Sequence, residues 1–143
     1  MASEVLGANK TKYDAGGSGD NYIGSKQYGG EVKCSYDTYE ASGLATGSTI
    51  SFTDLPDGAR IVGVELAWDA LGTSSTIALG DALDADRYIA ATSSVAAGSS
   101  NTIRVDDALG YVIGTTATDE VPIATLTSSS SLNGTIKCAI FYV

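Results

Sequence analysis

The chain of 143 residues is 43% hydrophobic, so it is long and apolar enough for one domain whose core needs neither disulfides nor metal. Its formal net charge of −9 disfavours binding to phosphate backbones, and no apolar run approaches the roughly 20 residues of a membrane-spanning helix. It has no histidine, which removes the commonest general base, the Ser–His triads and most zinc and copper sites.

The first thirty residues differ in character from the rest of the chain. Residues 14–30 are dominated by Gly, Ser, Asn and Asp, which favour turns and extended chain and cannot supply a core. Residues with contact area and few rotatable bonds nonetheless recur in this part of the chain, namely Tyr13, Tyr22, Ile23 and Tyr28. We therefore predict an extended N-terminal arm over residues 1–30, which docks on its own domain or on a partner, and a β-sandwich domain over residues 31–143.

From residue 31 onward, apolar and polar residues alternate with the two-residue period of β-strands. The clearest strand inside the domain is 60–68, where one face carries Val62, Val64, Leu66 and Trp68. The final strand, 134–143, carries on one face Ile136, Cys138, Ile140 and Tyr142. The other predicted strands are 31–39, a segment marked by Ile50 and Phe52, 76–79, 88–92 (a strand or a short helical turn), 101–105, 110–114 and 120–127. Polar turns are expected at 55–59 and 128–134.

No segment carries a long apolar stripe of helical period. About eight short strands joined by turns predict an all-β protein with a single β-sandwich, in the form of a jelly roll or a related Greek key. An immunoglobulin-like sandwich is the alternative, because the sequence does not distinguish between strand orders.

The two cysteines, Cys34 and Cys138, lie far apart in the sequence, each within an alternating stretch. The first residues of the chain lack the basic segment and apolar core of a signal peptide, so we expect synthesis and use in a cytoplasm. In that compartment two small buried hydrophobic residues are the favoured interpretation, and a disulfide between neighbouring strands is the alternative in an oxidising one. No Cys-x-x-Cys motif or second ligand cluster supports a zinc site.

The segment Gly80–Tyr88 is the most site-like cluster in the sequence. Its three carboxylates, Asp81, Asp84 and Asp86, could gather oxygen ligands around calcium in a loop. Their spacing does not match the EF-hand pattern, and Arg87 can neutralise them from within. The favoured interpretation is a turn in which Asp side chains cap backbone amides.

The chemistry of catalysis is poorly represented. Acidic residues are numerous enough to leave a carboxylate pair for glycoside cleavage open. A sugar-binding cleft, however, usually presents several exposed aromatic side chains, whereas the single Trp of this chain is expected in the core. We predict that the chain is not an enzyme and has no catalytic, cofactor-binding or metal site.

Several segments resemble small structural proteins encoded in the genomes of tailed bacteriophages. The first is Lys-Tyr-Asp-Ala-Gly-Gly-Ser-Gly-Asp-Asn-Tyr at 12–22, and the second is the Leu-Pro-x-Gly-Ala step into the strand at 55–62. The others are the Thr-Ile-x-Leu-Gly-Asp…Asp-Ala-Asp-Arg-Tyr segment at 76–88 and the closing strand at 134–143. The resemblance covers both ends and the middle of the chain, and the shared motifs are structural.

This resemblance implies a capsid decoration (cement) protein, a compact β-domain that binds the major capsid protein as a homotrimer. The protein would be made in the host cytoplasm and lie on the capsid exterior, with no nucleic-acid or membrane partner. We expect the arm to contact a capsid subunit or a sister protomer through Lys10, Lys12, Tyr13, Tyr22, Ile23 and Tyr28. The alternatives are a tail or fibre component that binds a host receptor and a carbohydrate-binding β-sandwich module.

Overall fold

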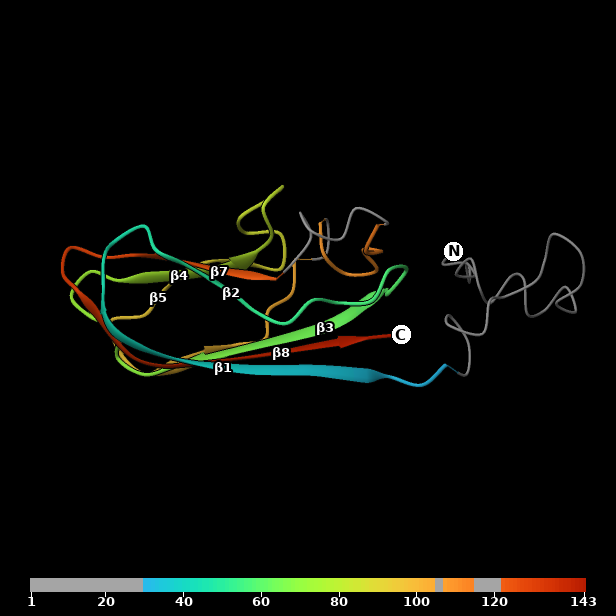
Figure 1. Ribbon diagram of the computed structural model, residues 1–143, viewed down its shortest axis with the longest axis horizontal. Helices are drawn as coiled ribbons and strands as arrows, with labels where there is room; N and C mark the ends of the chain where they lie inside the picture. The colour runs from blue at the N-terminus through green and yellow to red at the C-terminus, as the bar shows by residue number, and fades with distance from the viewer. Residues whose placement is uncertain (1–29, 105–106, 115–121) are drawn as a thin grey trace, which may run out of the picture. The chain divides into compact units, whose positions relative to one another are not determined.

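The computed structural model describes residues 30–104, 107–114 and 122–143 of the chain. This part contains strands, turns and loops and no helix (Figure 1). The strands are β1 (Lys33–Leu44), β2 (Thr49–Ser51), β3 (Ile61–Trp68), β4 (Thr76–Gly80), β5 (Ile89–Ser93), β6 (Gly98–Ser100), β7 (Ile123–Thr127) and β8 (Leu132–Tyr142). The predicted all-β class is therefore confirmed.

The strands form two four-stranded antiparallel sheets, in the orders β1-β8-β3-β6 and β2-β7-β4-β5. Four pairings join strands symmetrically placed about the middle of the chain: β1 with β8, β2 with β7, β3 with β6 and β4 with β5. This is the order of a jelly roll, a long antiparallel hairpin wrapped into a sandwich. In an immunoglobulin sandwich the first two strands share a sheet, whereas here they lie in different sheets.

Apolar residues that alternate along the strands form a core between the two sheets. From the first sheet it contains Val64, Leu66, Trp68, Ile136, Cys138 and Ile140. From the second sheet it contains Ile77, Leu79, Ala124 and Leu126. Full burial of a large aliphatic side chain stabilises a fold by about 1.5–3 kcal/mol, so these positions hold the sheets together. The predicted inward face of the final strand is confirmed at its three most buried positions.

The beginning of β3 differs from its predicted pattern. Ile61 is fully buried and Val62 is 37% exposed, the reverse of what strict alternation predicts. The pairing of β3 with β8 shifts register between Ile61 and Gly63, and such a bulge moves every earlier residue to the other face. Further along β3, Trp68 lies in the core as expected, and its indole Nε1 donates a hydrogen bond to the Ala96 carbonyl oxygen at 3.1 Å.

Two predicted strands are wrong in the region between β5 and β7. Residues 101–104 are not a strand, and 110–114 contributes only an isolated bridge between Arg60 and Val112. The strand β6 precedes them, at Gly98–Ser100, and has no apolar alternation. This strand pairs with the end of β3, where Gly98 lies opposite Trp68. Its position therefore depends on a strand distant in the sequence, which a local pattern does not reveal.

The prediction that both cysteines are buried is wrong for Cys34, which is exposed, and correct for Cys138. Both are free thiols. Cys138 opposes Asp37 across the β1–β8 pair, and Cys34 opposes Phe141. Burial, with a further contribution from the charges of Asp37 and Cys34, raises the pKa of the Cys138 thiol to about 12. A thiol in this state is a poor nucleophile.

Candidate functional site

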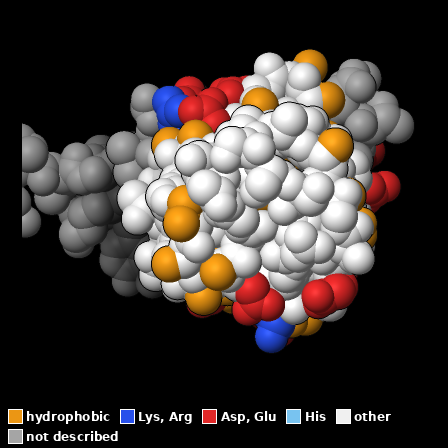
Figure 2. Space-filling view, turned by 90° about the vertical axis from the view of Figure 1, so that its left-hand side faces the viewer, with side chains coloured by type: hydrophobic (Ala, Val, Ile, Leu, Met, Phe, Trp, Pro, Cys, Tyr) orange, Lys and Arg blue, Asp and Glu red, His pale blue; other side chains and the backbone are white. Residues whose placement is uncertain are grey.

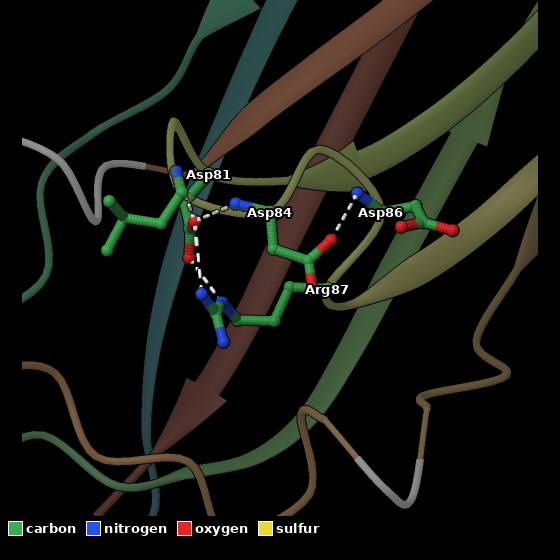
Figure 3. Close-up of polar contacts among 5 residues, drawn as sticks. Asp81, Asp84, Asp86 and Arg87 are labelled. Atoms are coloured by element: carbon green, nitrogen blue, oxygen red, sulfur yellow. Dashed lines mark hydrogen bonds and ion pairs between the residues drawn. The ribbon is translucent and has the colours of Figure 1, made fainter.

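The acidic loop between β4 and β5, residues 81–88, is built around the carboxylate of Asp81 (Figure 3). This residue is only 3% exposed. Its Oδ1 accepts hydrogen bonds from the backbone amides of Leu83 and Asp84, both at 2.9 Å. Its Oδ2 accepts from Arg87 Nε at 2.6 Å. The side chain thus caps a turn of its own loop, as the favoured interpretation predicted.

Arg87 occupies the position at which a cation would be expected beside Asp81. Its guanidinium also lies over the ring of Tyr111, with 4.2 Å between Cζ and the ring centroid. Burial by itself lowers the pKa of Arg87, but the hydrogen bond and charge of Asp81, with smaller contributions from Tyr111 and Tyr88, outweigh it and raise that pKa. The arginine therefore stays charged and neutralises the buried carboxylate.

The other two acidic residues of the loop do not converge on Asp81. Asp84 Oδ1 accepts from the Asp86 amide at 3.3 Å, and Asp86 Oδ2 forms an ion pair with Arg104 at 2.8 Å. Arg104 also pairs with Asp107 at 2.7 Å. In the described ranges no group of three or more His, Cys, Asp or Glu side chains is arranged to hold a metal ion. The alternative of a calcium loop thus finds no ligand set here.

A second feature, which the sequence prediction missed, is the solvent-facing surface of the first sheet. We call it the outer face; it comprises Cys34, Tyr36 and Thr38 of β1, Lys137, Ala139 and Phe141 of β8, and Gly63, Glu65 and Ala67 of β3. Ala139 lies between Tyr36 and Glu65, and Tyr36 is 60% exposed. A hollow of about 200 Å³ opens beside Tyr36, and its lining includes Glu65 and Lys137.

The outer face carries the carboxylate of Glu65, the ammonium of Lys137, the exposed thiol of Cys34 and the hydroxyl of Thr38 among small and aromatic side chains. A neighbouring hollow of about 250 Å³ is lined by Ala67, Trp68, Asp69, Thr135 and Lys137. The exposed tyrosines Tyr36 and Tyr39 lie on opposite faces of β1, because their positions differ by three, so they do not form one sugar-stacking platform.

A third hollow, a groove of about 370 Å³, lies between β5 and β6, the outermost strands of the two sheets. Hydroxyl groups and short apolar side chains dominate its walls: Ile89, Ala90, Thr92, Ser99, Ser100, Thr102, Ile103 and Arg104. The guanidinium of Arg104 is held by Asp86 and Asp107. The groove therefore presents no titratable pair for acid–base chemistry.

One end of the sandwich has an uncharged surface, with charged and apolar side chains at its margin (Figure 2). The turns at 45–48, 69–75, 94–97 and 128–131 contain many Ser, Thr and Gly residues and a single charged one, Asp69. Their polar groups bind one another. The hydroxyls of Ser128 and Ser129 both donate to the Thr73 carbonyl oxygen at 3.0 Å, and the Ser128 amide donates to Thr46 Oγ1 at 3.0 Å.

The contact residues predicted for the arm lie outside the described residues: Lys10, Lys12, Tyr13, Tyr22, Ile23 and Tyr28. Their role stays a prediction, as does the division into an arm over 1–30 and a domain over 31–143. Within the described ranges no helix is able to cross a bilayer.

No protein-family model and no curated protein matches the sequence. Solved structures with a similar fold include the following two. A chain of the "Cyanophage Pam1 capsid asymmetric unit" aligns with a TM-score of 0.64 at 24% identity, over 78% of this chain and 83% of that one. A chain of the "Acidic stable capsid structure of Helicobacter pylori bacteriophage KHP30" aligns with a TM-score of 0.55 at 12% identity, over 78% and 86%. At these identities the likeness establishes a shared fold.

Proposed function

We propose that this chain is a structural protein of a phage virion, a decoration (cement) protein that binds the outside of the capsid and stabilises the shell. The observation that carries the proposal is the jelly roll shared with chains of two phage capsid structures. Each alignment covers similar fractions of this chain and of the capsid-structure chain, so those chains have about the length of this one. A fold of this size is suited to an accessory subunit placed repeatedly over a lattice.

The physical properties of the chain support this role. A protein that binds only the mature shell stabilises that shell by mass action. Repeated over many lattice sites, modest contacts become collectively strong. In the described residues, the hollows hold no nucleophile–base pair and the buried carboxylate of Asp81 is neutralised by Arg87. An inert β-domain with a broad exposed face is what such attachment requires.

The major capsid protein is the proposed partner and a homotrimer the proposed assembly, both on the strength of the family resemblance. The proposed attachment is the N-terminal arm, in which Tyr13, Tyr22 and Tyr28 supply contact area and Lys10 and Lys12 supply positive charge. The acidic domain, with thirteen acidic and four basic residues over 34–143, then faces solvent on the capsid exterior.

The test uses mature capsids that lack this protein, prepared from a phage that carries the gene. Full-length chain is expected to co-sediment with them and to raise their melting temperature, whereas a chain lacking residues 2–24 should remain folded and not bind. Failure of the full-length chain to bind would refute the proposal. Equal binding by the truncated chain would refute the role of the arm alone.

The uncharged, hydroxyl-rich end of the sandwich keeps a tail or fibre component open as a second candidate, because adhesion would use loops gathered at one end. Gene order discriminates between them. A position beside the major capsid and protease genes favours decoration, and one among tail genes favours adhesion. A carbohydrate-binding module is less well supported, since the exposed Tyr36 and Tyr39 do not share a face.

A further inference from the structure

The outer edge of β1 is unpaired among the described residues, and β1 lies outside the predicted arm over residues 1–30. Among the described residues, β1 is the outermost strand of its sheet and pairs with β8 alone, from Lys33 opposite Tyr142 to Leu44 opposite Leu132. None of the residues 33–40 is buried. A long, exposed edge strand is a template for pairing with another chain, and natural proteins usually cover or interrupt such an edge.

Among the described residues, the side chain of Asp37 interrupts this stretch of the edge. Its Oδ2 accepts hydrogen bonds from the amide and the hydroxyl of Thr53, at 3.1 and 3.0 Å. Its Oδ1 accepts from the amide of Thr38 at 2.8 Å. Since backbone groups alternate in direction along a strand, the groups of Cys34 and Tyr36 face the same open side as the Thr38 amide. No strand of the described residues pairs on this side of β1, which leaves it able to receive a partner strand.

Two of the three charged residues of β1, Lys33 and Asp37, are placed symmetrically about Ser35, and the third is Glu40. Lys33 lies two residues before Ser35 and Asp37 two residues after it, so both side chains are on the same face of the strand. If two copies of β1 pair in antiparallel fashion with Ser35 opposite Ser35 of the second copy, Lys33 opposes Asp37 twice. A pair centred on Lys33 or on Asp37 brings like charges together. If the two strands pair around Cys34 or around Tyr36, neither Lys33 nor Asp37 lies across from a residue of opposite charge.

We propose that β1 pairs with β1 of a second copy of this chain around a two-fold axis at Ser35. The pairing joins two four-stranded sheets into one of eight strands. Two cross-strand ion pairs fix its register, and opposite charges set directly across a strand pair favour association. On the outer face the exposed Tyr36 then lies opposite Cys34 of the second copy, which extends the contact across apolar surface.

This contact goes beyond attachment to a capsid and does not depend on it. The same surface is used by both copies, so the contact closes on itself and stops at two chains. It leaves the rest of each domain available for a three-fold contact. On a lattice it would link neighbouring assemblies across two-fold positions.

The first experiment is cross-linking of the full-length chain carrying Tyr36→Cys under mild oxidation. The new thiol at position 36 opposes native Cys34 of the second copy, so two reciprocal disulfides should form and a non-reducing gel should show a covalent dimer. Adding Cys34→Ser should abolish the dimer. The matched control, Thr38→Cys with native Cys34, has its thiol out of register and should stay uncross-linked. Ladders of trimers and longer species would overturn the two-fold arrangement.

The second experiment reverses the charges and measures the dimer dissociation constant by sedimentation velocity. Lys33→Glu and Asp37→Lys should each weaken association by about tenfold or more, and the double variant should restore it. Lys137→Glu, an equal change of charge on the outer face away from the edge, should leave the constant within about threefold. Melting curves show whether Asp37→Lys folds despite losing Thr53, and Lys33→Glu tests the pairing without that contact.

A chain that stays monomeric at all concentrations, or is insensitive to Lys33→Glu, would overturn the pairing. Loss of capsid binding with an intact dimer would instead overturn the proposed function and leave the pairing in place.

Discussion

A Cβ atom on Gly80 would lie 2.1 Å from the carbonyl oxygen of Asp84, far inside any real contact distance. The acidic loop therefore folds back onto the end of β4. Its backbone occupies the space that a side chain at position 80 would need. The close approach lets the loop place the buried carboxylate of Asp81 beside the Asp84 amide at 2.9 Å. The glycine is thus a requirement of the loop and not of a ligand.

We predict that Gly80→Ala destabilises the domain by roughly 2–3 kcal/mol, because the obstructing atoms belong to the backbone and have to move with the whole loop. The control is Gly63→Ala, also within a strand, whose Cβ would meet Phe141 at an ordinary 3.4 Å and should cost less than about 1 kcal/mol. Urea unfolding followed by the fluorescence of Trp68, the single Trp, measures both. Equal costs would contradict the steric account.

The ion pair between Asp81 and Arg87 should contribute far more to stability than the exposed pair between Asp86 and Arg104. Arg87→Met leaves a fully buried carboxylate without its counter-charge, and breaking a buried pair in this way costs roughly 3–5 kcal/mol. Asp86→Asn removes a side chain that is 45% exposed and should cost less than about 1 kcal/mol. Urea unfolding of the two variants compares them directly, and similar losses would show that burial does not govern these pairs.

Calcium should have no effect on thermal stability. Arg87 neutralises Asp81, and Asp84 and Asp86 bind partners of their own, so no cation site is formed among the described residues. A ligand that binds only the folded state would raise the melting temperature as its concentration rises. Scanning calorimetry in calcium and in chelator is expected to give the same melting temperature, and a calcium-dependent rise would establish a site.

The parts of the fold that could be predicted are strands with one face buried in the core and the other exposed to solvent. The final strand is of this kind, with Ile136 and Ile140 fully in the core, and its alternation indicated both its existence and its inward face. The acidic loop was predictable as well, because an Asp after a Gly commonly caps the turn that follows. Local chemistry was sufficient in both cases.

The remainder depends on distant partners. In β1, Cys34 was expected to be buried, but the residues opposite core positions of β8 are Ser35, facing Ile140, and Asp37, facing Cys138. An edge strand can invert the usual pattern because its inward side chains still reach water. The exposure of Gly63, Glu65 and Ala67 was predictable from the mixed face of their strand, but the outer face as one surface was not, since it depends on strand order, which the sequence did not distinguish.

The two thiols should differ sharply in reactivity. Cys34 is exposed on the outer face, whereas Cys138 is 2% exposed and its pKa is raised to about 12 by burial, so its thiolate is scarce at neutral pH. Mass spectrometry after maleimide treatment is expected to show one label on the folded chain and two in urea. The variant Cys34→Ser should show none when folded. Rapid double labelling of the folded chain would contradict the buried position.

Cys138 should also make stability fall with alkaline pH. A thiol whose pKa is raised on folding contributes stability that is fully present below its unfolded pKa, about 9.0, and is lost as the pH rises toward about 12. In a Cys34→Ser background, the stability advantage of Cys138 over Cys138→Ala should shrink by about 1.4 kcal/mol per pH unit above pH 9. Urea unfolding from pH 8 to 11 measures it, and the shared background cancels the titration of Lys and Tyr. A difference that stays constant over this range would show that the thiol is not desolvated in the folded protein.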